Sequence, residues 1–220
     1  MRKTLKYLLL VSIVAGASYL LGWSSLLTVK SVEVIGAPNQ STISQVITLS
    51  GIAPGQKLAR VEPRVVKTQV MSAQWIAKAA VSRNWLNGAV RIAVTPREAI
   101  FAYNGRYLDA TGALFDLPEG VSVGSIGKIV APSLELAQIG ELVYRELPIE
   151  MQRELIEISV SSGSRIDLTI KNGSRKVLVH WGDKSQGSLK AQVFQRLIAL
   201  PENKKITLMD LIAPAAPIVK

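Results

Sequence analysis

Residues 76–95 read IAKAAVSRNWLNGAVRIAVT, with the dipeptide Asn87-Gly88 between two largely apolar runs. Asn-Gly favours a type I′ turn, because both central residues of that turn need a positive φ. After the dipeptide, Val90, Ile92 and Val94 occupy every second position, which is typical of a strand with one buried face. The stretch therefore predicts an antiparallel hairpin with one strand on each side of the dipeptide.

Two further Asn-Gly dipeptides, Asn104-Gly105 and Asn172-Gly173, predict hairpins later in the chain. Around the second, apolar residues again occupy every second position. Such alternation indicates half-buried antiparallel sheet. The expected strand pairs are Ala99–Tyr103 with Arg106–Asp109 and Arg165–Lys171 with Ser174–Val179.

Two helices are expected before the first hairpin. Thr42 and Gln45 form a candidate capping box for a helix over Ile43–Leu49, and Gly51 would end it. Pro63 suits the first turn of a second helix that ends at Met71.

Later helices are marked by prolines and by leucines at helical spacing. The expected segments are Ser133–Leu147, Ile149–Ile156, a helix over Leu189–Leu200 with a Ser188 cap, and a final strand over Ile206–Leu211. Pro214 and Pro217 indicate an extended tail after this strand.

The N-terminal segment indicates a membrane anchor. Tyr7–Val29 carries no charge, and as a helix it would be about 35 Å long against a hydrocarbon core of about 30 Å. Arg2, Lys3 and Lys6 precede it, so the positive-inside bias places the N-terminus in the cytoplasm and the later domains outside. A cleavable signal peptide is the alternative, with Ala15-Gly16-Ala17 as its cleavage site, but apolar sequence continues past that site.

The fold class expected from these elements is α+β. It comprises a single N-terminal transmembrane helix, a β-α-α-β-β domain and a mostly antiparallel β domain with flanking helices. The expected bounds are 1–6 for a cytoplasmic tail, 7–28 for the transmembrane helix, 29–97 and 98–213 for the two domains, and 214–220 for the tail.

The amino-acid composition excludes several kinds of functional site. The chain has no cysteine, which excludes disulfides, thiol catalysis and cysteine-based metal sites, and it has one histidine, His180. The formal net charge is +10, but the cations are dispersed, which argues against a nucleic-acid site. Attraction to anionic lipid or to a wall polymer stays open.

One segment fits the residue pattern of a catalytic motif but lacks the sequence context that the motif requires. Residues 120–124 fit G-x-S-x-G, and Ser122, Asp167 and His180 follow in the order of an α/β-hydrolase triad. A nucleophile elbow needs a strand before the serine and a helix after it, whereas glycines and prolines flank Ser122 on both sides. An exported serine hydrolase is therefore the weakest interpretation.

Over essentially its whole length, the chain resembles the FtsQ/DivIB family of bacterial cell-division proteins. VKSVEVIG at 29–36 resembles the opening strand of a POTRA domain, GIAPGQKL at 51–58 the bend between its helices, and WIAKAAVSR at 75–83 a later strand. YLDATGALF at 107–115 and ITLMDL at 206–211 resemble signatures of the second domain. The resemblance assigns structural signature roles to Gly36, Gly51, Gly55, Trp75, Asp109, Gly112 and Phe115, and Lys190 stands where the family commonly has lysine.

This resemblance implies a non-enzymatic scaffold of the divisome, without catalytic residues, metal or cofactor. Such proteins are single-pass proteins of the cytoplasmic membrane at the division septum. They bind FtsB- and FtsL-type single-span proteins, and septal synthase components are further expected partners. They couple divisome assembly to septal peptidoglycan synthesis. A POTRA-bearing transport or assembly chaperone is the alternative function.

The expected partner site is the final strand, because an exposed sheet edge offers unpaired N–H and C=O groups to another chain. Its residues are Ile206, Thr207, Leu208, Met209, Asp210 and Leu211. Gln192, Gln195 and Arg196 on the preceding helix are weaker candidates. The alternative is that this strand is central and only closes the core.

Overall fold

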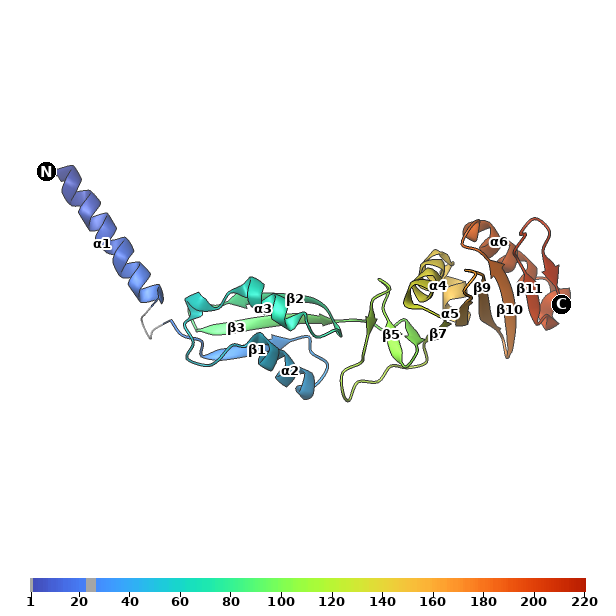
Figure 1. Ribbon diagram of the computed structural model, residues 1–220, viewed down its shortest axis with the longest axis horizontal. Helices are drawn as coiled ribbons and strands as arrows, with labels where there is room; N and C mark the ends of the chain where they lie inside the picture. The colour runs from blue at the N-terminus through green and yellow to red at the C-terminus, as the bar shows by residue number, and fades with distance from the viewer. Residues whose placement is uncertain (1, 23–26) are drawn as a thin grey trace. The chain divides into compact units, whose positions relative to one another are not determined.

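The computed structural model describes residues 2–22 and 27–220, drawn as a ribbon in Figure 1. The chain begins with helix α1 (Arg2–Gly22). It divides into two compact units at Arg97 and Glu98, and the short loop 118–121 belongs to the first unit.

The expected membrane span, residues 7–28, begins within α1 and includes residues 23–26, which lie outside the described residues. None of the helices within residues 2–22 and 27–220 is long and apolar enough to cross a membrane. The span therefore stays a prediction.

The first unit has the predicted β-α-α-β-β order. Its elements are β1 (Ser31–Ile35), α2 (Gln40–Ser50), the 3₁₀ turn η1 (Leu58–Arg60), α3 (Pro63–Val70), β2 (Ile76–Arg83) and β3 (Ala89–Pro96). The sheet order is β1-β3-β2, with β1 parallel and β2 antiparallel to the central β3.

The core of this unit lies on one face of the sheet. Val90, Ile92 and Val94 of β3 are buried, as are Val46 of α2 and Val70 of α3. On the other face Arg91 is exposed, and its guanidinium lies 3.2 Å from the Glu33 carboxylate of β1. The alternation along β3 thus separates a face covered by helices from a face in water.

The capping box of α2 differs from the prediction. Helix α2 begins at Gln40, and its N-cap is Asn39, whose Oδ1 accepts a hydrogen bond from the Thr42 amide at 2.9 Å. Thr42 Oγ1 in turn accepts a bond from the Asn39 amide at 3.1 Å. Gln45 instead accepts a bond from the Trp75 indole at 2.8 Å, while Gly51 ends the helix as predicted.

The hairpin of residues 76–95 forms, but its turn is wider than predicted. Strands β2 and β3 are joined by residues 84–88, and within this loop only Gly88 has a positive φ. The Asn84 amide donates to the Ala89 carbonyl and its carbonyl accepts from the Gly88 amide. The two-residue type I′ turn predicted here is therefore wrong.

The second unit contains one large sheet and three helices among its described residues. The strands are β4 (Phe101–Tyr103), β5 (Arg106–Leu108), β6 (Leu114–Phe115), β7 (Gly127–Val130), β8 (Leu155–Val160), β9 (Ile166–Asn172), β10 (Arg175–Gly182), β11 (Leu208–Asp210) and β12 (Ile218–Val219). The helices are α4 (Leu134–Glu146), α5 (Ile149–Glu154) and α6 (Gly187–Ile198), and a 3₁₀ turn, η2, spans Pro201–Lys205.

The nine strands lie in the order β12-β11-β10-β9-β8-β7-β4-β5-β6. The pairs β10–β11, β7–β8 and β4–β7 are parallel, and the other described pairs are antiparallel. The sheet is thus mixed, with antiparallel pairs in the majority. In Figure 1, α4, α5 and α6 lie beside the strands of this unit.

Three local predictions in this unit need correction. Only Asn104-Gly105 has two positive φ angles, whereas the β9–β10 turn is centred on Gly173 and Ser174. Helix α5 ends at Glu154, because Leu155–Val160 pairs with β7 and β9 as strand β8. Helix α6 is preceded by Gln186 rather than capped by Ser188.

Candidate partner-binding surface

Strand β11 has a neighbour on each side. Leu208, Met209 and Asp210 pair in parallel with Leu178–His180 of β10, and Met209 and Asp210 pair in antiparallel fashion with β12. The prediction that Ile206–Leu211 forms an exposed sheet edge is therefore wrong.

The chain after β11 turns back instead of extending away. The Ile212 amide donates to Asp210 Oδ1 at 2.9 Å, and the Ala216 amide donates to the Ala213 carbonyl at 2.9 Å. Pro214 and Pro217 lie in or beside this reversal. Prolines stop a strand because they lack an amide donor, but they do not prevent the chain from returning as a new strand.

The six predicted edge residues divide between core and surface. Ile206, Met209 and Leu211 are buried in the core of the second unit. Thr207 is exposed, and Leu208 and Asp210 are half-buried. Half of the predicted site thus stabilises the fold and is not available to a partner.

Strand β12 is the end of the sheet in this direction. The Lys220 amide donates to the Leu208 carbonyl at 2.9 Å, and the Leu208 amide donates to the Lys220 carbonyl at 3.0 Å. Hydrogen-bonding residues alternate along an antiparallel pair, so Val219 directs its amide and carbonyl away from β11. This outer side of β12 is the candidate edge.

One face of the sheet near this edge carries apolar side chains that reach the surface. Leu178 lies opposite Leu208, and Asp210 lies opposite Ile218. Leu178 and Ile218 are 37% and 54% exposed. Because directly paired residues share a face, these side chains lie on the same side of the three strands, opposite the buried Met209.

A polar pair lies on the same face. His180 pairs in register with Asp210, and its Nδ1 lies 2.8 Å from Asp167 Oδ1 on β9. Ser122, the third residue of the hypothetical triad, is exposed in the loop before β7, and a strand rather than a helix follows it. The local structure thus lacks the nucleophile elbow of the hydrolase interpretation.

The weaker candidates on α6 lie in two environments. Gln192 and Arg196 are exposed, whereas Gln195 is half-buried. Gln195 lines a cavity of about 430 Å³ together with Met151 of α5, Ile170 of β9 and other residues of these elements. None of the residues that line this cavity comes from β11 or β12, so the cavity is separate from the candidate edge.

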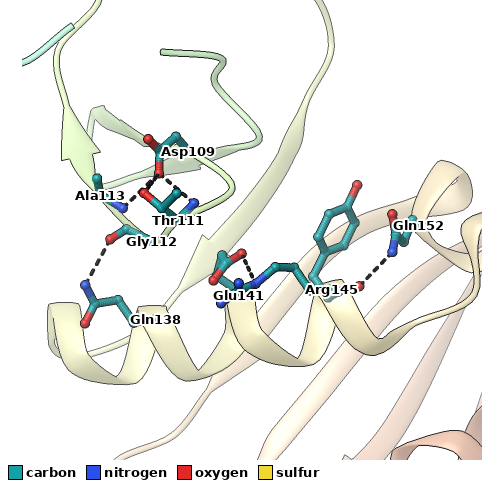
Figure 2. Close-up of polar contacts among 9 residues, drawn as sticks. Asp109, Thr111, Gly112, Ala113, Gln138, Glu141, Arg145 and Gln152 are labelled. Atoms are coloured by element: carbon teal, nitrogen blue, oxygen red, sulfur yellow. Dashed lines mark hydrogen bonds and ion pairs between the residues drawn. The ribbon is translucent and has the colours of Figure 1, made fainter. Parts of the chain in front are cut away.

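The signature segment 107–115 forms a tight loop around Asp109, shown in Figure 2. Asp109 Oδ1 accepts hydrogen bonds from the Thr111 amide at 2.8 Å, the Thr111 hydroxyl at 2.6 Å and the Ala113 amide at 3.0 Å. The Gly112 carbonyl accepts a bond from Gln138 Nε2 of α4 at 2.9 Å. The loop thereby attaches β5 and β6 to α4.

Next to this loop lies a buried carboxylate that was not among the residues predicted from the sequence. Glu141 of α4 is 1% exposed, and Arg145 Nε lies 2.8 Å from its Oε1 (Figure 2). Burial raises the pKa of Glu141, while the Arg145 charge acts in the opposite direction. In the sequence, this ion pair is indicated only by the spacing of Glu141 and Arg145, because residues four apart are neighbours on one side of a helix.

The remaining signature residues are structural. Phe115 and Trp75 are buried, and the Gly55 amide donates to the Val29 carbonyl at 2.8 Å. Lys190 is 1% exposed, and its Nζ donates to the Asp183 carbonyl at 2.9 Å and to the Asp183 carboxylate at 3.2 Å. This lysine therefore holds the loop before α6.

Comparison with known proteins identifies the first unit. Residues 27–97 match the family model described as "POTRA domain, FtsQ-type". The match covers about a third of the chain and includes all of β1–β3 with α2 and α3. No curated protein matches the chain.

Proposed function

We propose that this chain is a non-enzymatic scaffold of the bacterial divisome. The FtsQ-type POTRA domain at 27–97 confirms its resemblance to the FtsQ/DivIB family. Residues 7–28 would anchor it in the cytoplasmic membrane, with the N-terminus in the cytoplasm and both compact units outside. There it would recruit FtsB- and FtsL-type proteins at the septum and couple divisome assembly to septal peptidoglycan synthesis. The chaperone alternative has no specific observation in its favour.

The observation that carries the partner-binding part is the position of β12 at the end of the nine-stranded sheet. Its outer side offers the Val219 amide and carbonyl to an added strand. In this assignment the partner binds to β12, which lies beside β11, and not to residues 206–211 as predicted from the sequence.

Backbone pairing alone would bind a partner weakly. Strand β12 has two residues, and a ladder hydrogen bond contributes about 0.5–1.5 kcal/mol net. Side-chain contacts must therefore supply most of the affinity. Ile218 on β12 and Leu178 on β10 are exposed apolar side chains on one face of the sheet beside this edge.

Val219→Pro tests this edge. Proline would remove the outward-facing amide of β12 but leave the Lys220 and Leu208 bonds available. We expect loss of co-purification with the FtsB-type partner, while the variant stays in the membrane fraction. Val219→Ala is the matched control, since it changes the same side chain but keeps the outward-facing amide and should retain the partner.

Undiminished partner capture by a folded Val219→Pro variant would exclude the β12 edge. The scaffold role is tested separately by depletion, which should produce long, undivided cells, and by a fluorescent fusion, which should form a band at mid-cell. A uniform membrane signal together with normal division would contradict the divisome assignment and favour the chaperone.

A further inference from the structure

The loop between β2 and β3 presents two large apolar side chains to solvent. Leu86 is 97% exposed and Trp85 is 39% exposed. Neither side chain contributes to the buried core of the first unit. Single exposed apolar residues are common on soluble proteins, so these two need an argument from their position.

The loop is ordered by its own hydrogen bonds. Asn84 Oδ1 accepts bonds from the amides of Leu86 at 3.0 Å and Asn87 at 3.4 Å, and Asn87 Oδ1 accepts one from the Ala89 amide at 3.0 Å. These contacts hold the loop without covering Leu86. The exposure of Leu86 is therefore a property of a defined turn.

Trp85 is held against a cation that is itself fixed. The Arg83 guanidinium carbon lies 4.9 Å from the centre of the Trp85 ring. Arg83 Nη1 donates to the carbonyls of Leu58 at 3.2 Å and Val61 at 3.0 Å. An indole stacked on a guanidinium is amphipathic, with a polar partner on one face and apolar atoms on the other.

The loop lies where the chain enters the first unit. The Lys30 amide donates to the Gly88 carbonyl at 2.8 Å, and Gly88 packs against the carbonyl of Thr28. The proposed membrane span ends at residue 28, so the residue bonded to the loop follows the span by two positions. Two residues reach at most about 7 Å.

Cations gather at this same end of the unit. Lys30 is exposed next to the loop, and Arg83 contacts η1, which is flanked by Lys57 and ends at Arg60. Thr28 forms a bridge with Lys57. Aromatic and aliphatic groups next to lysine and arginine match a bilayer interface, with apolar groups at the acyl boundary and cations at anionic headgroups.

We propose that Trp85 and Leu86 insert into the interface of the bilayer that holds the anchor and so fix the orientation of the first unit on the membrane. The occupant of this surface is lipid, with Leu86 at the acyl boundary and Trp85 at headgroup depth. This inference rests on the proposed anchor, because only the short connection to residue 28 brings the loop to the bilayer.

The absence of cysteine from the chain allows a direct test. Leu86→Cys in the full-length protein, labelled with an environment-sensitive fluorophore, is reconstituted into nanodiscs of phosphatidylethanolamine and phosphatidylglycerol. Some discs contain lipids with a nitroxide on the acyl chain, which quenches nearby fluorophores. Because Leu86 is almost fully exposed, the substitution should not disturb folding.

Gln40→Cys is the matched control. Gln40 is exposed in the same unit and follows β1, at the opposite end of the sheet from the 84–88 loop. We expect nitroxide lipids to quench the label at 86 several-fold more strongly than the label at 40. Roughly equal quenching in protein that is incorporated into discs would overturn the proposal.

Two other outcomes separate the alternatives. If the label at 86 is shielded from iodide in water but not quenched by nitroxide lipid, another protein surface covers the loop and the lipid assignment is wrong. If the protein does not incorporate into discs at all, the anchor in the proposed function fails, and this inference fails with it.

Discussion

Lys220 and Leu208 exchange two backbone hydrogen bonds, with N···O distances of 2.9 and 3.0 Å. The Thr207 amide adds a third bond to the Lys220 carbonyl at 2.7 Å. These bonds place β12 over the side of β11 that would otherwise be the sheet edge. Any partner strand must therefore either pair with β12 or displace it, and the geometry of Val219 favours pairing.

Deleting residues 213–220 should destabilise the second unit and promote self-association. The deletion removes β12 and leaves the backbone groups of β11 exposed on one side, which makes them a template for pairing with another copy. With the three backbone bonds of Lys220 lost at about 1 kcal/mol each, we expect the unfolding free energy to fall by about 3 kcal/mol. Denaturant unfolding and light scattering measure the two effects.

Ala215→Gly and Ala216→Gly together provide the control for this deletion, since they change the turn but keep β12. An unaltered unfolding free energy in the deleted chain would show that β12 contributes nothing to the sheet.

Gly36→Ala should destabilise the first unit more than Gly51→Ala. Both glycines have positive φ angles, +86° and +62°, so an alanine at either position costs about 1–2 kcal/mol of backbone strain. At Gly36 a Cβ would also collide with the carbonyl oxygen of Val94, whereas at Gly51 it would meet open space. Thermal unfolding of the two variants measures the difference. Equal losses would mean that the β1 end can shift away from Val94.

Asp109→Ala should loosen the 107–115 loop. Asp109 Oδ1 accepts three hydrogen bonds, and leaving these donors unsatisfied should cost about 1–3 kcal/mol. Asp109→Asn retains an oxygen acceptor and should recover much of the loss. Amide hydrogen exchange of Thr111 and Ala113 reports on the loop directly. Identical exchange in the alanine and asparagine variants would contradict this account.

Stability at low pH should depend on Asp183. Hydrogen bonds from Ser185 and Lys190 lower the pKa of Asp183 from 3.8 to about 2. Since the pKa is lower in the folded state, the stabilisation is complete above about pH 4 and is lost as the pH falls toward 2. Asp183→Asn should reduce the change in melting temperature with pH across this interval. A wild-type and an Asn variant with parallel pH profiles would rule out this contribution.

Much of the first unit could be predicted from local patterns. The alternation of Val90, Ile92 and Val94, the proline at the start of α3 and the glycine after α2 each act through neighbouring residues. The N-cap of α2 was missed because Asn39 and Thr42 cap reciprocally, a geometry that the candidate pair Thr42 and Gln45 also allows on paper.

The second unit was harder to predict from the sequence, because its sheet joins segments that are distant along the chain. Leu155–Val160 lies directly after a helix, and its strand state depends on β7 and β9. The position of β11 in the sheet likewise depends on its two neighbouring strands. The local sequence of a strand does not indicate whether both of its sides are paired.

The amino-acid sequence by itself determined the element types of the first unit, their POTRA-like order and the absence of thiol chemistry, because these follow from side-chain identity and short-range spacing. Only the tertiary structure decided which strand ends the sheet. That depends on whether residues 212–217 turn back, and the reversal gains its free energy from the long-range bonds of Lys220 with Leu208.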